Sequence, residues 1–293
     1  MYRDEFQKYL QSEKRFSNHT VKAYITDLNQ FSNFIIDNGF SSSIMDVGHK
    51  DIRSWLVSLV NESNISSNSI NRKLSSLKTY FRFLQLTQVL SVNPTVKVVA
   101  PKMSKKLPEF VDQSSMNKLL NVGVFEEGFE GERNQLIIEL LYQTGIRLSE
   151  LIGISIDDIQ ELSKTVKVLG KRNKQRLVPL NAEIIKLCVS YLKHRNEIDV
   201  SCDSLIVTKK GKKAYPKMIY NIVNSYLAKV STISKKSPHV LRHTFATHML
   251  NNGADLNTIK ELLGHANLSA TQIYTHNSFE KLKTIYNQAH PRA

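Results

Sequence analysis

Apolar residues recur at helical spacing through most of the first ninety residues. One run extends from Val21 to Ile35, a second from Ile52 to Leu59, and a third from Ile70 to Leu84. Residues three or four positions apart lie on one face of a helix, so each run predicts an amphipathic helix. Ser17 is the expected N-cap of the first helix, and the third is expected to begin near residues 66–69. The three helices together predict a small, all-helical domain over residues 1–91.

The helical pattern stops between residues 92 and 108. Pro94 and Pro101 break the backbone there. Four lysines make the same stretch basic: Lys97, Lys102, Lys105 and Lys106. We therefore predict a basic linker at residues 92–108 that crosses a phosphate backbone, followed by a second domain at residues 109–293.

The second domain is predicted to be mainly α-helical with a small β-sheet. Two β-prone runs, Thr165–Leu169 and Gln175–Leu180, flank a short connection that contains glycine and asparagine. This pattern is typical of a β-hairpin, and it places Lys171 at an exposed tip. Near the end of the chain, apolar residues at helical spacing between Phe279 and Tyr286 predict a last amphipathic helix.

The charge of the chain indicates a polyanionic partner. Lysine and arginine outnumber aspartate and glutamate by 40 to 26, which gives a net charge of +14. Such an excess favours nucleic acid. The first ten residues lack an apolar signal core, and runs such as Leu136–Tyr142 are too short to span a bilayer, so we expect a cytosolic protein without a membrane partner. Cys188 and Cys202 stand outside any close Cys/His cluster and are expected to be ordinary thiols.

Helix starts in the first domain carry basic residues, including Lys22 on the first helix and Arg72 and Lys73 on the third. Helix N-termini attract phosphate through their free N–H groups and their dipole, and basic side chains add charge. A solvated polar face is the alternative interpretation of the same pattern. The overall charge favours DNA contacts, and the full set of candidates is Lys22, Arg72, Lys73, Lys102, Arg172 and Lys174.

Six residues that suit phosphoryl transfer follow one another over about 130 positions: Arg147, Lys171, His239, Arg242, His265 and Tyr274. Their order resembles the active-site set of the tyrosine recombinases, which are similar to phage integrases. Four phrases resemble the bacterial Xer subgroup, namely Tyr142–Arg147, Leu263–Ala266, Ile273–His276 and the terminal His290–Ala293. The resemblance covers essentially the whole chain.

The two arginines suit the charge of the reaction. Attack on a phosphodiester builds negative charge on the non-bridging oxygens, and forked guanidinium donors from Arg147 and Arg242 are suited to bind them. Simpler interpretations are a helical ion pair of Arg147 with Glu150, and a surface position for Arg242. Glu150 is expected to orient Arg147 or to cap local structure, not to act as a base.

Tyr274 is the expected nucleophile, and a phosphotyrosyl bond would conserve the energy needed for rejoining without ATP. A core aromatic on an amphipathic helix is the alternative for this residue. His239 precedes Arg242 by three residues, so both can face one phosphate, and its imidazole suits acid–base or hydrogen-bonding work. His265 is expected to donate to a phosphate oxygen. His243, His248 and His276 are interpreted as structural.

The leaving 5′ oxygen needs a proton, and the resemblance implies that a hairpin lysine supplies it. Lys171 is the position that matches. Arg172, Lys174 and Arg176 are alternatives for this proton or for phosphate contacts.

The resemblance further implies a C-shaped DNA clamp, with a helical core-binding (SAM-like) domain and a mixed α/β catalytic domain on opposite faces of the duplex. It implies strand exchange at short inverted-repeat sites on double-stranded DNA, in a tetramer with itself or with a paralogous recombinase. It implies resolution of chromosome dimers at a dif-like site before cell division, with a DNA translocase as a further partner. No cofactor or metal is expected. The last helix would dock on a neighbouring subunit or, alternatively, cap its own chain.

Three other functions fit the same residues. An integrase of a mobile element or integron would use identical chemistry on different sites. A type IB-like relaxing enzyme would nick and reseal DNA as a monomer. A sequence-specific architectural protein would bind DNA and leave its intact set of catalytic residues unused. Formation of a covalent adduct separates it from the Xer-like recombinase, the integrase and the relaxing enzyme.

Overall fold

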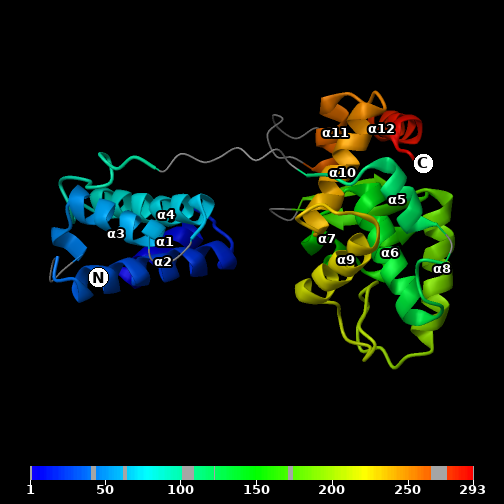
Figure 1. The fold of residues 1–293 in the computed structure, drawn as a ribbon, viewed down its shortest axis with the longest axis horizontal. Helices are drawn as coiled ribbons and strands as arrows, with labels where there is room; N and C mark the ends of the chain where they lie inside the picture. Colours follow the sequence, from blue (N-terminus) through cyan, green and yellow to red (C-terminus); the bar gives the residue numbers. More distant parts are fainter. Residues whose placement is uncertain are drawn as a thin grey trace. The chain divides into compact units, whose positions relative to one another are not determined.

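The chain forms two compact units, Met1–Lys106 and Leu107–Ala293, which are described separately (Figure 1). The structure is a computed structural model. It describes residues 2–40, 44–61, 65–100, 109–121, 123–170, 174–264 and 276–292, with only the backbone described for residue 45 and residues 276–281. Within these residues, no helix combines the length and the apolar character needed to cross a membrane.

The described residues of the N-terminal unit form four α-helices and a short 3-10 helix at Ile44–Asp46. The α-helices are α1 (Arg3–Ser12), α2 (Asn18–Asp37), α3 (His49–Asn61) and α4 (Ser67–Leu86). The three expected helices are confirmed, and Ser17 caps α2 by accepting a hydrogen bond from the Thr20 amide at 3.3 Å. Helix α1 was not predicted, although Phe6, Tyr9 and Leu10 form a buried stripe at helical spacing.

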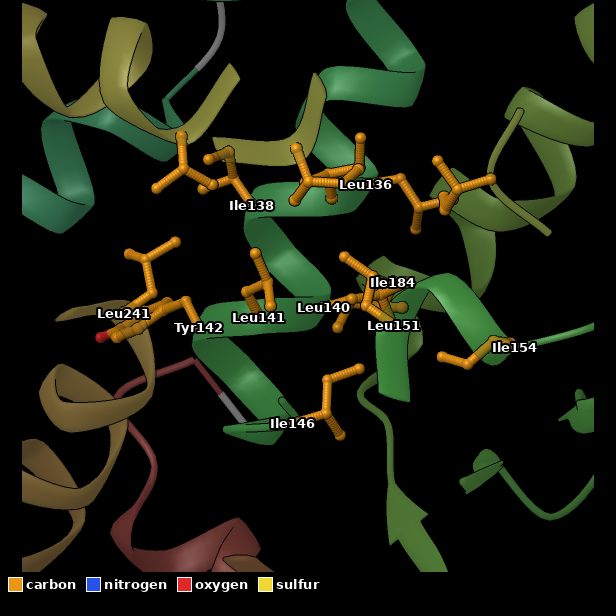
Figure 2. Close-up of a cluster of buried hydrophobic side chains, with 14 of the residues drawn as sticks. Leu136, Ile138, Leu140, Leu141, Tyr142, Ile146, Leu151, Ile154, Ile184 and Leu241 are labelled. Carbon is orange, nitrogen blue, oxygen red and sulfur yellow. The ribbon is translucent and has the colours of Figure 1, made fainter. Parts of the chain in front are cut away.

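The C-terminal unit is built around α6 (Phe129–Thr144), which is buried along almost its whole second half. In Figure 2 its side chains point to both sides of the helix and enter one apolar cluster with residues of neighbouring elements. The surrounding helices are α5 (Gln113–Leu120), α7 (Leu148–Gly153), α8 (Ala182–Asn196), α9 (Pro216–Val230) and α10 (Pro238–Asn251). Cys188 lies buried in this core, and both Cys188 and the half-buried Cys202 are free thiols, as predicted.

The small sheet has three antiparallel strands, β1 (Ile159–Gln160), β2 (Thr165–Leu169) and β3 (Gln175–Pro179), in the order β1-β2-β3. The predicted hairpin between β2 and β3 is confirmed, with Val168 opposite Arg176 in the register. Its connection is closed by a 2.8 Å hydrogen bond from the Gly170 amide to the Lys174 carbonyl. The strand β1 was not predicted, because two residues are too few to show a periodic pattern.

A smaller apolar cluster joins α10 to the last two helices, α11 (Leu256–Leu263) and α12 (His276–Ala289). Tyr286 of α12 is fully buried in it, beside Phe245 and Leu262. The Asn252 side-chain amide also donates to the Ala289 carbonyl at 2.8 Å. In this single chain the predicted last helix therefore packs on its own unit, which is the intramolecular arrangement of the two that the sequence left open.

Candidate active site

Three arginines from distant parts of the chain meet at the C-terminal end of α11. Arg176, Arg242 and Arg147 donate N–H groups to the carbonyl oxygens of residues 262, 263 and 264, over 3.1, 2.9 and 3.3 Å respectively. The last carbonyls of a helix have no partner within the helix, and they form the negative end of its dipole. The end of α11 is thus a point at which positive side chains are stabilised and held together.

Arg147 is the N-cap residue of α7 and lies against Glu150. Its backbone N–H donates to Glu150 Oε2 at 2.8 Å, and its Nη1 donates to Glu150 Oε1 at 2.7 Å. The side chain of Arg147 nevertheless keeps 24% of its surface exposed. The predicted ion pair at helical spacing is therefore present, and it orients a guanidinium that still reaches the surface.

Glu150 binds a second arginine as well. Nη1 and Nη2 of Arg176 donate to its two carboxylate oxygens at 3.0 and 2.9 Å. Burial by itself raises the pKa of Glu150, but the hydrogen bonds and charges of Arg176 and Arg147 outweigh burial and lower its pKa to about 2. Glu150 is therefore a carboxylate at neutral pH. As expected from the sequence, it orients Arg147 and caps α7.

Arg242 lies on α10 and reaches from there to two carbonyls. Its Nη1 donates to the Gly145 carbonyl at 2.6 Å and its Nη2 to the Leu263 carbonyl at 2.9 Å. Burial, assisted by the nearby charge of Arg147, lowers the pKa of Arg242 to about 10. The guanidinium consequently remains protonated at neutral pH.

Gly145 allows α10 and α11 to approach the end of α6 because of its conformation and its small size. Its φ of +59° ends α6 in the left-handed region, which favours glycine. A Cβ at this position would lie 2.5 Å from Phe245 Cδ1 and 2.7 Å from Leu263 Cδ2, closer than real contacts allow. The glycine before Ile146 and Arg147 therefore lets α6, α10 and α11 converge.

His239 stands in the first turn of α10, on the same helix as Arg242 and three residues before it, and its side chain is exposed. Of the histidines interpreted as structural, His248 is buried and its Nδ1 lies 3.0 Å from Tyr142 Oη. His243 is half-buried on α10, and the side chain of His276 lies outside the described residues.

Several of the predicted site residues lie outside the described residues: Lys102, Lys171, Arg172, His265 and Tyr274. The described residues next to two of them come close to the arginines. The Gly264 carbonyl accepts from Arg147, and a Cβ at Gly170 would lie 3.7 Å from Glu150 Oε1. Gly170 and Gly264, the residues that directly precede Lys171 and His265, thus lie beside the arginine cluster.

The prediction that Arg176 could contact a phosphate or supply the proton of the leaving group is corrected by its position. Its side chain is only 5% exposed, and all three of its donor nitrogens bind protein atoms. The alternation of the strand contained the signal, because Arg176 shares the inward face of β3 with Val178. Lys174, in contrast, is exposed at the end of the hairpin connection, directly before β3.

In the N-terminal unit, three of the predicted DNA-contacting residues, Lys22, Arg72 and Lys73, line an open pocket of about 290 Å³. Lys22 and Arg72 are exposed there, and Arg72 forms an ion pair with Asp27. Lys73 is buried, with its ammonium 3.1 Å from Asp27 Oδ1 and bound to Gln30 as well. The ammonium of Lys73 is thus paired within the unit, although its side chain also lines the pocket, and its contact with DNA stays a prediction.

Two family models match the two units. Residues 109–281 match the phage integrase family, and residues 4–88 match the phage integrase, N-terminal SAM-like domain. The chain is similar to the tyrosine recombinase XerC of Staphylococcus aureus, with 39% identity over 292 residues, covering 99% of this chain and 96% of the relative. It is also similar to the tyrosine recombinase XerC of Chlorobaculum tepidum, with 36% identity over 99% of this chain and 94% of the relative.

Solved structures share the fold. The XerH site-specific recombinase bound to a palindromic difH substrate has a TM-score of 0.73 at 22% identity, covering 96% of this chain and 83% of that one. The Tn1549 transposon integrase in complex with transposon right end DNA has a TM-score of 0.75 at 17% identity, covering 96% and 98%. At these identities the likeness supports the fold alone.

Proposed function

Because the chain belongs to the phage integrase family, as a tyrosine recombinase of the Xer subgroup, we propose that it cuts and rejoins duplex DNA through Tyr274. It is a site-specific DNA recombinase. The observation that carries the residue assignment is the convergence of Arg147 and Arg242 on the end of α11, both partly exposed and both positively charged. Such paired forks suit the non-bridging oxygens of a phosphate.

In the proposed reaction, the Tyr274 hydroxyl gives up its proton, for which the His239 imidazole is a candidate acceptor, and its oxygen attacks phosphorus as the phenolate. A 3′-phosphotyrosyl bond forms while the bond to the 5′ oxygen breaks. The 5′ oxygen leaves as a hydroxyl after it takes a proton, which we assign to Lys171. Arg147 and Arg242 bind the charge that develops on the non-bridging oxygens. His239 and His265 hydrogen-bond the same phosphate. Rejoining reverses these steps with a 5′ hydroxyl from another strand, so no cofactor is consumed.

The positive surroundings also favour the nucleophile. A free phenol has a pKa near 10, and neighbouring positive charge favours the phenolate. Glu150 neutralises part of the charge of Arg147 and Arg176, but Arg242 has backbone carbonyls as its partners. The described part of the site therefore retains a net positive charge toward a phosphate.

For the biological role, we propose resolution of chromosome dimers at a dif-like site in the cytoplasm. The identity to two XerC proteins over nearly the whole chain supports this role. We expect the two units to bind the duplex from opposite faces, in a tetramer of this chain with itself or with a paralogous recombinase, and with a DNA translocase as a further partner. A mobile-element integrase remains the second candidate, and the choice of DNA site separates the two.

Covalent trapping tests the chemistry. Wild type, Tyr274→Phe and the control Tyr220→Phe are incubated with nicked duplexes that carry chromosomal or mobile-element sites, and then run on a denaturing gel. Tyr220 is a suitable control because it is an exposed tyrosine of α9. We expect an adduct with wild type and Tyr220→Phe but none with Tyr274→Phe. An adduct with Tyr274→Phe would assign the nucleophile elsewhere. DNA binding without any adduct would favour either a missing partner subunit or the architectural alternative, and adding the partner recombinase decides between them.

A further inference from the structure

We propose that Arg176 is a positioning residue of the recombination reaction, which holds the two groups that orient Arg147. This inference rests on the proposed function and extends it to a side chain that does not itself reach DNA. Arg176 is buried, as described above, so any effect it has on the reaction must pass through its neighbours.

The first of these neighbours is Glu150. The forked pair between Arg176 and Glu150 uses both carboxylate oxygens, and Glu150 Oε1 is shared with Arg147 Nη1. A fork–fork pair restricts the carboxylate in rotation as well as in distance. Arg176 thereby determines the plane in which Glu150 receives Arg147.

The second neighbour is the end of α11. Arg176 Nε donates to the Leu262 carbonyl, two residues before the Gly264 carbonyl that receives Arg147 Nη2. The backbone also packs directly on the guanidinium, because a Cβ at Gly264 would lie only 3.0 Å from Arg176 Nη1. Among the described residues, the Arg147 guanidinium thus donates to Glu150, which Arg176 binds directly, and to the Gly264 carbonyl at the helix end that Arg176 binds through Leu262.

Arg176 also ties the hairpin to this point. It lies on β3, and a Cβ at Gly170, across the hairpin, would lie 3.6 Å from its Nη1. Gly170 directly precedes Lys171, and Gly264 directly precedes His265. The buried Arg176 guanidinium therefore lies against Gly170 and Gly264, which precede two proposed active-site residues. Through Glu150 it also connects this point to Arg147, which we propose binds the phosphate.

Loss of Arg176 has a specific expected consequence. Among the described residues, the Glu150 carboxylate would then have Arg147 as its one cationic partner, and it would draw that guanidinium away from the phosphate. A misplacement of about 1 Å can cost roughly 100-fold in rate. We expect Arg176→Lys, which keeps the charge but loses the fork, to lower the rate of covalent cleavage by about 10- to 100-fold. DNA affinity should stay within about twofold, because Arg176 is buried and makes no contact with the duplex.

The test measures single-turnover cleavage of the nicked duplex over a range of protein concentrations, which gives the rate at saturation and the half-saturating concentration separately. Arg195→Lys is the matched control, because Arg195 is another buried arginine of the same unit that donates to two backbone carbonyls, away from the site. Rates are divided by the DNA-binding-competent fraction. Arg176→Gln serves as a second variant if Arg176→Lys does not fold.

A double-mutant cycle separates positioning from a general effect on folding. In an Arg147→Lys background, a further Arg176→Lys change should lower the remaining cleavage rate by less than about twofold, because the group that it positions is already altered. Equal losses in both backgrounds, or wild-type cleavage by Arg176→Lys, would overturn the inference and leave the proposed function intact. Absence of any wild-type adduct, also after a partner recombinase is added, would instead contradict the proposed function and, with it, the inference.

Discussion

Both units contain a buried carboxylate that binds two basic side chains, one of them buried and the other partly exposed. The sets are Asp27 with Lys73 and Arg72, and Glu150 with Arg176 and Arg147. In each case the carboxylate is almost inaccessible, with 1% of Asp27 and 2% of Glu150 exposed. A buried carboxylate is stabilised when it is fully paired, and it then fixes the basic side chain that reaches the surface.

The two clusters differ in what they hold in place. In the N-terminal unit the buried partner is Lys73, whose ammonium also binds Gln30, and the exposed Arg72 lines the pocket together with Lys22. In the C-terminal unit the buried partner is an arginine with a planar fork, and a further arginine, Arg242, meets the same helix end. Lysine acts as a point charge, whereas arginine fixes direction. The first cluster is therefore suited to presenting a charge, and the second to positioning groups for chemistry.

Glu150→Gln should have the largest effect. It removes the charge that both arginines share, so we expect cleavage to fall by roughly 100-fold at saturating protein. Because the folded-state pKa of Glu150 is depressed from 4.5 to about 2, its contribution to stability is complete above pH 4.5 and is lost as pH falls through about 2. That contribution is about 3 kcal/mol. Unfolding measured between pH 7 and 2 should therefore show a smaller acid loss in the variant than in wild type.

Two outcomes would contradict this view of Glu150. One is wild-type cleavage by Glu150→Gln, and the other is an unchanged acid dependence of the unfolding free energy. Asp27→Asn provides the control for the cleavage measurement, because Asp27 lies in the other unit and should leave the saturated cleavage rate unaltered.

Asp27→Asn should have an intermediate effect, confined to the N-terminal unit. It leaves the buried ammonium of Lys73 without its carboxylate, and removing one partner of a buried pair costs about 3 kcal/mol or more. We expect weaker DNA binding, because Arg72 loses its orienting partner, together with an unchanged cleavage rate at saturation. Chemical denaturation and DNA titration measure the two effects. A lower rate at saturation would show that the cluster of Asp27, Lys73 and Arg72 affects the chemistry and does not only present a charge.

Arg72→Ala should have the smallest effect, because it removes only a side chain that is 42% exposed. If Arg72 contacts a phosphate, the logarithmic dependence of DNA affinity on salt should lose about one unit of slope, with unchanged cleavage at saturation. Filter binding between about 50 and 200 mM salt measures this slope. Lys50→Ala, at an exposed lysine of α3 outside the pocket, is the control. A wild-type affinity that hardly varies with salt would contradict DNA binding through this charge.

Local elements of the fold could be predicted from the sequence. The helices α2, α3 and α4, the N-cap at Ser17 and the hairpin β2-β3 depend on patterns within a few residues of each other. Periodicity and capping are local properties, so they are visible without any knowledge of the fold. Short elements such as α1 and β1 escaped because they provide few repeats of the pattern. The order of the six motif residues likewise indicated the family, since it depends on identity and spacing alone.

Only the tertiary structure decided which basic residues are available to a ligand. Lys73 has the same side chain as the exposed Lys174, and Arg176 has the same side chain as the exposed Arg72. Lys73 and Arg176 are nevertheless buried against carboxylates far away in the sequence. Their partners are 46 and 26 residues distant, and the carbonyl that receives Arg147 is 117 residues away. Such pairs depend on how helices and strands pack. The alternation of β3 indicates that Arg176 faces inward, but it does not indicate which carboxylate Arg176 meets. The convergence of three arginines on the end of α11 is therefore a property of the fold, whereas the presence of arginines suited to phosphate was already determined by the sequence.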